Sequence, residues 1–128
     1  MSYYFAKTLD ASFSDAVLRV TEALKVEGFG IVSDIDFRST LKTKLDVNFR
    51  DYRILGACNP KLAYEALQIE DRVGTMLPCN VVVQDVGEGK TEVAAIDPVA
   101  SMRAIENAAL IVAAENVRQK LKNVIDRL

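Results

Sequence analysis

The chain has no histidine and no tryptophan, and only two cysteines and three prolines in 128 residues. The absence of histidine excludes Ser-His and Cys-His nucleophile activation, histidine general bases and the commonest side-chain metal ligand. Any catalysis would have to depend on cysteine, aspartate, glutamate, lysine or tyrosine. The sequence therefore favours a protein that is not an enzyme.

The two cysteines are Cys58 and Cys79, with 20 residues between them. This spacing matches neither a C-x-x-C redox motif nor a metal-binding ribbon. We expect both residues to be reduced thiols, because disulfides are rare in a reducing compartment. With no histidine and no ligand-spaced cysteines, we expect no bound metal and no cofactor.

Charge and hydropathy exclude two further classes of partner. The formal net charge is −2, and acidic and basic residues are mixed along the chain, so nucleic acid is not an expected partner. No stretch approaches the roughly 20 apolar residues that a membrane-spanning helix needs. The first residues, Met1–Lys7, have neither a basic leader nor an apolar signal segment. We therefore expect a cytoplasmic location and no membrane partner.

What is present is the composition of an ordinary globular protein. Half of the residues are apolar and 27% are charged. A chain of this length buries roughly two thirds of the surface that it exposes when unfolded, so it needs no disulfide or metal to fold. We predict a single domain over residues 1–128.

Strand and helix patterns alternate along the chain. Strand Ile31–Phe37 carries Asp34 and Asp36 on one face, whereas a parallel strand buried on both faces would be continuously apolar. The turn at Gly87–Lys90 joins two strands as an antiparallel hairpin. These features predict an α+β fold with helices on one face of an antiparallel sheet. Strands are expected at Tyr3–Thr8, Ile31–Phe37, Tyr52–Cys58, Cys79–Gln84 and Thr91–Ile96, and helices from Ser12, at Ser39–Leu45, from Asn59-Pro60, and from Asp97-Pro98 to the end of the chain.

The last predicted helix is the longest, and its segment Ala104–Ala114 is apolar almost all round. A helix of that kind contacts more than a single sheet face. It can cross the core or pack against a second subunit, and the pattern favours the core.

Two Cys-Asn pairs are the candidate site. Cys58 and Asn59 lie where a strand meets a helix, and Cys79 and Asn80 follow Pro78 at the start of a strand. Each pair places a thiol and an amide at a rigid strand end, where they could bind a small molecule. Packing of both cysteines as small apolar residues, helix capping by Asn59 and a backbone contact of Asn80 are the competing interpretations.

Asp34 and Asp36 share a strand face, as a divalent-cation site requires, but a solvated strand face is the simpler interpretation. Gly87–Lys90 resembles the end of a phosphate loop. It is too short for one, and a strand follows it instead of a helix.

The segments Tyr52–Pro60, Leu77–Val83 and Ile96–Pro98, in this order and spacing, resemble the domain-of-unknown-function family numbered 302. The resemblance spans nearly the whole chain. It implies a fold similar to that of the TATA-box-binding protein, a curved antiparallel sheet with helices packed on it, and a homodimer, but no established activity. The family often has a glycine after the Lys-Leu pair of the short helix. Asp46 stands there in this chain, which disfavours a left-handed turn.

Three functional hypotheses follow. The first is a small dimeric binding or sensing domain with a pocket near Cys58, Asn59, Cys79 and Asn80. The second is a thiol-dependent protein that handles sulfur or redox equivalents through Cys79. The third is a structural interaction module.

Overall fold

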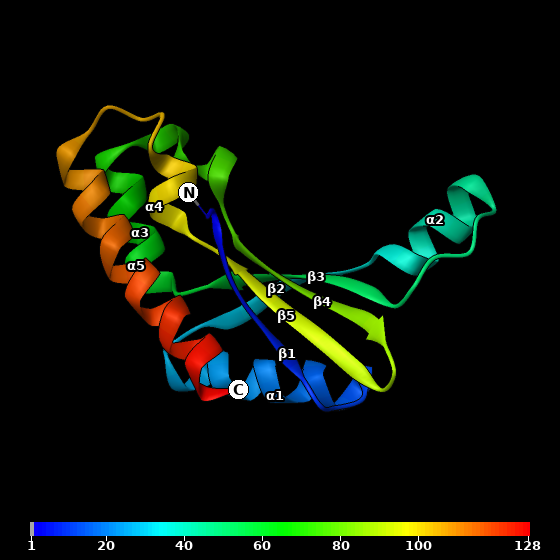
Figure 1. Cartoon of the computed structure of the whole chain (residues 1–128). Coiled ribbons are helices and arrows are strands. Elements are labelled where there is room, and N and C mark those ends of the chain that lie inside the picture. The colour runs from blue at the N-terminus through cyan, green and yellow to red at the C-terminus, as the bar shows by residue number, and fades with distance from the viewer. Residues whose placement is uncertain (1) are drawn as a thin grey trace.

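The computed structural model describes residues 2–128 and has a five-stranded antiparallel sheet with helices packed on one face (Figure 1). The order of strands across the sheet is β1-β5-β4-β3-β2. The predicted α+β fold is therefore confirmed. Along the chain the elements are β1 (Tyr4–Leu9), α1 (Phe13–Val26), β2 (Gly30–Asp36), α2 (Phe37–Leu45), β3 (Tyr52–Cys58), α3 (Pro60–Ile69), the 3-10 helix η1 (Asp71–Met76), β4 (Cys79–Gly87), β5 (Lys90–Ile96), α4 (Pro98–Met102) and α5 (Ala108–Arg127).

Helix starts follow the predicted capping residues. The side chains of Ser12, Asn59 and Asp97 accept hydrogen bonds from the first backbone amides of α1, α3 and α4. Pro60 and Pro98 occupy the first turn, where a missing amide hydrogen costs nothing. Short polar signals in the sequence thus fix where three of the helices begin.

The helices bury two apolar clusters. The larger lies between the sheet and helices α1 and α5, which pack against each other and against the central strands. The smaller lies among α3, η1, α4 and α5, beside the end of the sheet where β3 ends and β4 begins. Among residues 2–128 no helix is long and apolar enough to cross a membrane.

The last helical region is two helices, so the prediction of one helix from Asp97-Pro98 is wrong. The α4 helix ends at Met102, and α5 begins after Asn107, whose side chain caps it. The apolar segment Ala104–Ala114 is divided between the core and the surface. Leu110 and Ala114 are buried in the smaller cluster, whereas the side chain of Val112 is 66% exposed.

Strand β2 contains a bulge that the alternating pattern did not predict. The register shifts between Ile31 and Ser33, so Ile31 packs on the core while Ile35 lies on the other face of the sheet and is 44% exposed. The two aspartates have structural partners: Asp34 forms an ion pair with Arg53 at 3.6 Å, and Asp36 caps α2.

The turn after α2 is left-handed even though it lacks glycine. Asp46 has φ of 53° and ψ of 37°, and its carboxylate accepts a hydrogen bond from Lys42 Nζ at 2.7 Å. Aspartate is one of the few residues other than glycine that enter this conformation, so the turn forms in spite of the substitution.

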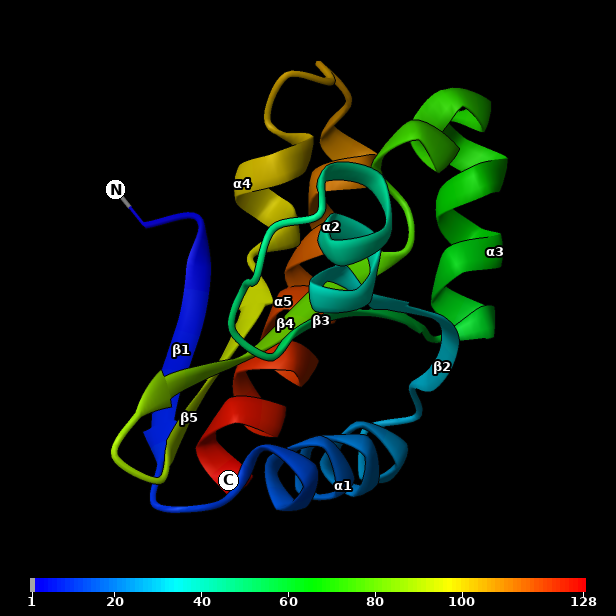
Figure 2. The same ribbon diagram turned by 90° about the vertical axis from the view of Figure 1, so that its right-hand side faces the viewer.

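Helix α2 stands apart from the rest of the chain. It rises from the sheet on the side opposite α1, and no other helix lies beside it (Figures 1 and 2). It has no buried residue, and its main contacts are with β3. The uncovered face of the sheet and this isolated helix are therefore surfaces that other elements of residues 2–128 leave largely uncovered.

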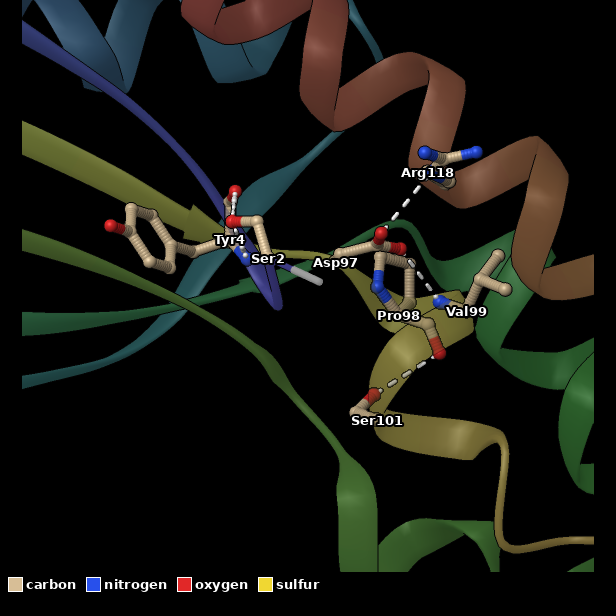
Figure 3. A network of polar contacts seen from close by, with 7 residues as sticks. All are labelled: Ser2, Tyr4, Asp97, Pro98, Val99, Ser101 and Arg118. Carbon is tan, nitrogen blue, oxygen red and sulfur yellow. Dashed lines mark hydrogen bonds and ion pairs between the residues drawn. The ribbon is translucent and has the colours of Figure 1, made fainter.

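Asp97 joins β5 to α4 and α5 through several contacts (Figure 3). Its carboxylate accepts from Val99 N at 3.0 Å and forms an ion pair with Arg118 Nε at 3.2 Å, and its backbone amide donates to the carbonyl of Tyr3.

We expect Asp97→Ala to lower the free energy of unfolding by about 1–2 kcal/mol, because a helix cap is lost. Urea denaturation would measure this.

The matched comparison is Arg118→Ala. The side chain of Arg118 is half exposed, although that of Asp97 is buried, so solvent screens the ion pair from the arginine side and its contribution to stability should be smaller than that of the cap. An Arg118→Ala effect as large as that of Asp97→Ala would contradict capping as the main role of Asp97.

Candidate functional site

A pocket of about 370 Å³ opens between α3 and α5, at the edge of the sheet where β3 ends and β4 begins. Its wall is almost wholly apolar, and no charged side chain lines it. The lining residues are Phe29, Val32, Ala57, Cys58, Asn59, Leu62, Ala63, Ala66, Leu67, Gly74, Leu77, Pro78, Cys79, Met102, Leu110, Ala113, Ala114 and Val117.

Three of the four predicted site residues, Cys58, Asn59 and Cys79, line this pocket. Strands β3 and β4 are antiparallel neighbours, and Ala57 lies opposite Cys79. The end of one strand therefore meets the start of the other, although the two Cys-Asn pairs are far apart in the sequence. Both cysteines are free thiols, and Cys58 is the more exposed.

Burial controls the chemistry of Cys79. Its side chain is only 6% exposed, and this burial, with a smaller contribution from Cys58, raises the pKa of the Cys79 thiol from an ordinary value of 9.0 to about 11. A buried thiolate would lack solvation. The thiol of Cys79 is therefore neutral at physiological pH, and it makes the pocket wall apolar.

Asn59 is held in place from two sides. Its Oδ1 accepts the hydrogen bond from Leu62 N that caps α3. A Cβ on Gly28 would lie 2.9 Å from Asn59 Nδ2, and Gly28 has φ of +85°, so no other residue fits that position easily. The Nδ2 group makes no hydrogen bond to any residue between 2 and 128, and only Oδ1 of this side chain has a partner. Asn59 is the residue with a side-chain amide in the pocket wall, and its Nδ2 lies beside Gly28.

Asn80 lies on the opposite face of the sheet from the pocket. Neighbouring residues of a strand point to opposite faces, so Cys79 is buried among the helices while Asn80 is exposed. Asn80 lines a separate, shallow groove with Tyr52, Val82 and Glu92. The structure therefore divides the second Cys-Asn pair between two surfaces.

Most of the pocket wall was not predicted as a site. The helices supply small side chains where they face each other, with Ala63 and Ala66 from α3 and Ala113 and Ala114 from α5. The signal in the sequence was the use of alanine on the apolar stripes of both helices. Small residues at facing positions leave space that leucine or phenylalanine would fill.

The polar groups of the site do not form catalytic machinery of a familiar kind. Within residues 2–128, no three histidine, cysteine, aspartate or glutamate side chains come together as a metal site would require. The pocket offers apolar surface, two thiols and one amide donor. Such a site can hold an uncharged molecule.

Comparisons with known proteins agree with the architecture. A search of curated proteins found no match. A crystal structure of an uncharacterized conserved DUF302 protein from Bacillus stearothermophilus is similar, with a TM-score of 0.91 and 26% sequence identity over 99% of this chain and 98% of that one. The family model described as domain of unknown function DUF302 matches residues 5–128. The chain therefore belongs to the DUF302 family.

Proposed function

We propose that this protein is a binding or sensing domain for a small, uncharged, mainly apolar ligand. The observation that carries the proposal is the apolar pocket between α3 and α5, with no charged side chain in its wall. A charged ligand would lose its hydration there without gaining a partner, so uncharged ligands are preferred.

The pocket also limits the size and shape of the ligand. Its 370 Å³ lies near the lower end of the roughly 300–1,000 Å³ that is usual for small-molecule sites. One end of the ligand would lie against the thiols of Cys58 and Cys79. A single acceptor oxygen on the ligand could accept a hydrogen bond from Asn59 Nδ2.

Titration with the fluorescent probe N-phenyl-1-naphthylamine tests the proposal, because this molecule is apolar, uncharged and of suitable size. We expect saturable binding with one probe per chain. Its anionic relative 1-anilinonaphthalene-8-sulfonate, which adds a sulfonate group, should bind at least about tenfold more weakly. Equal affinity for the two probes, or no saturation, would contradict the proposal.

The pocket also brings the two thiols together, which favours a thiol-dependent role as a second candidate. The raised pKa of Cys79 opposes this role for Cys79 itself, because the thiolate is the reactive species. With a pKa of about 11, only about one Cys79 thiol in 10,000 is ionised at pH 7.

We expect native Cys79 to react with iodoacetamide far more slowly than a free thiol at pH 7. We also expect Cys79→Ser to lower the free energy of unfolding by about 1–3 kcal/mol, because the serine hydroxyl would be buried in an apolar setting. The raised pKa also makes stability depend on pH. The folded state favours the neutral thiol, so its stabilising effect is complete below pH 9 and is lost as the pH rises toward about 11. Rapid alkylation of Cys79, followed by mass spectrometry, would favour the thiol-dependent role.

We further propose that the protein is a cytoplasmic homodimer. The two free thiols suit a reducing compartment. The isolated helix α2 and the uncovered sheet face suit an assembly of two copies. Light scattering of the intact protein at micromolar concentration would test the oligomeric state.

A further inference from the structure

Helix α2 lacks the packing that normally stabilises a short helix. It has nine residues and none of them is buried. Isolated helices shorter than roughly 12–15 residues are marginal in water, and most helices in proteins are stabilised by burying one face. The α2 side chains Phe37, Leu41 and Leu45 recur every four residues and form an apolar stripe, and Leu45 is 66% exposed. Phe37 contacts the ring of Tyr52 at the base of the helix, and Leu41 is partly buried, but within residues 2–128 nothing buries the stripe at its Leu45 end.

The uncovered sheet face, on the side opposite α1 and α5, carries a matching surface. One row of apolar side chains crosses all five strands in register on this face, and a second row beside it is mostly polar. A shallow groove of about 350 Å³ runs along the face and is lined by three tyrosines, which are favoured at protein interfaces. The apolar row is Ile35, Ile54, Val82, Ala94 and Ala6, and the second row is Tyr52, Gln84, Glu92 and Thr8.

The two surfaces are complementary in size and charge. Ala6 and Ala94 are small, so a helix can approach the β1 and β5 end of the apolar row closely. Helix α2 is basic, and its Lys44 has no acidic partner within residues 2–128. Glu92, in the second row, likewise forms no ion pair in that part of the chain, and its carboxylate accepts only from Gln84 Nε2. A basic amphipathic helix suits an apolar row that has a carboxylate beside it.

We propose that α2 of each copy lies on the open sheet face of a second copy, with its apolar stripe on the row that contains Ala94. This inference rests on the proposed homodimer and names its interface. One chain supplies both the uncovered helix and the face that fits it, and a two-fold axis satisfies both at once. This interface differs from the exposed α5 surface around Val112. That surface belongs to Ala104–Ala114, the segment whose apolar pattern allowed contact with a second subunit.

Light scattering of the full-length protein and three variants tests the inference. Leu45→Asp places a charge in the α2 stripe, and Ala94→Glu places one on the apolar row of the sheet face, at β5. Val112→Asp is the matched control, because Val112 is as exposed as Leu45 but lies on α5. Circular dichroism before and after heating establishes that each variant is folded. Leu45 lies on an exposed helix, so Leu45→Asp remains informative if Ala94→Glu does not fold.

We expect the wild type and Val112→Asp to be dimers, and Leu45→Asp and Ala94→Glu to dissociate at least about tenfold more readily. If the wild type is a dimer and Leu45→Asp dimerises equally well, the interface is wrong although the dimer stands. Loss of the dimer in Val112→Asp alone would place the interface on α5 and overturn the inference. A monomeric wild type would overturn both proposals.

Discussion

Replacing Gly56 by valine is expected to lower the free energy of unfolding by about 3 kcal/mol or more. Gly56 is buried in β3, and a Cβ there would overlap Ser33 Oγ and lie 2.6 Å from Pro78 Cγ. Overpacking of this kind forces the neighbouring backbone to move. Pro78 immediately precedes Cys79, so the displacement would also reach the pocket wall. Urea denaturation would measure the loss of stability.

Gly30→Val is the matched control for this prediction. Gly30 is also in a strand next to β3, but nothing lies within 4 Å of the position that its Cβ would occupy. Valine suits strands better than glycine, so the control should be neutral or slightly stabilising. Gly56→Ala adds only the Cβ and should also lower the free energy of unfolding. A second substitution, Ser33→Ala, should recover part of that loss, because it removes Ser33 Oγ, the atom nearest to the new Cβ. Equal effects of Gly56→Val and Gly30→Val would show that strand propensity, and not close packing, accounts for Gly56.

Local signals predicted much of the fold. The helix starts at Ser12, Asn59 and Asp97 depend on a side chain and backbone amides two or three residues away, so a short stretch of sequence contains all the information. The hairpin between β4 and β5 depends on the adjacent turn in the same way. The antiparallel sheet followed from charged residues on alternate strand positions.

Features that depend on tertiary contacts were not predicted. The bulge in β2 places Ile31 and Ile35 on opposite faces of the sheet, and it is an irregularity of pairing with β3 that no periodic pattern shows. The break between α4 and α5 contains no glycine or proline, and its one local signal is the cap residue Asn107, which the helical periodicity of the flanking residues obscured. The first error arose where strand pairing overrides the periodic pattern, and the second where a single capping residue was missed.

The candidate site was predicted in the same partial way. Cys58, Asn59 and Cys79 were selected because they stand at strand ends, and antiparallel pairing brings those ends together. Asn80 was selected with its neighbour Cys79. Strand alternation already implies that the two side chains point to opposite faces, so its position could have been predicted. The α3 and α5 walls could not, because they depend on how the two helices pack.

Replacing Ala113 by phenylalanine is expected to weaken binding of N-phenyl-1-naphthylamine at least about tenfold. Ala113 lies in the pocket wall on α5 and is partly buried, so a phenylalanine ring there would occupy space that the probe needs. Because the ring fills an existing cavity, the free energy of unfolding should change by less than about 1 kcal/mol. The change should therefore be seen in the probe titration and not in urea denaturation.

Ala109→Phe provides the control. Ala109 is one turn earlier on α5, is exposed and does not line the pocket. The same substitution there should leave probe affinity within about twofold of the wild type. Equal losses in the two variants would mean that the probe binds elsewhere, or that any added aromatic ring on α5 disturbs it.

The most direct test of the central claim is a nuclear magnetic resonance titration of the isotope-labelled protein with N-phenyl-1-naphthylamine. Pocket binding predicts that the largest backbone amide shifts occur at Ala63, Leu67 and Ala113, with smaller shifts at the strand ends near Cys58 and Cys79. Shifts concentrated on the open sheet face, at Tyr4, Val82 and Ala94, or no specific shifts at saturating probe, would contradict the account.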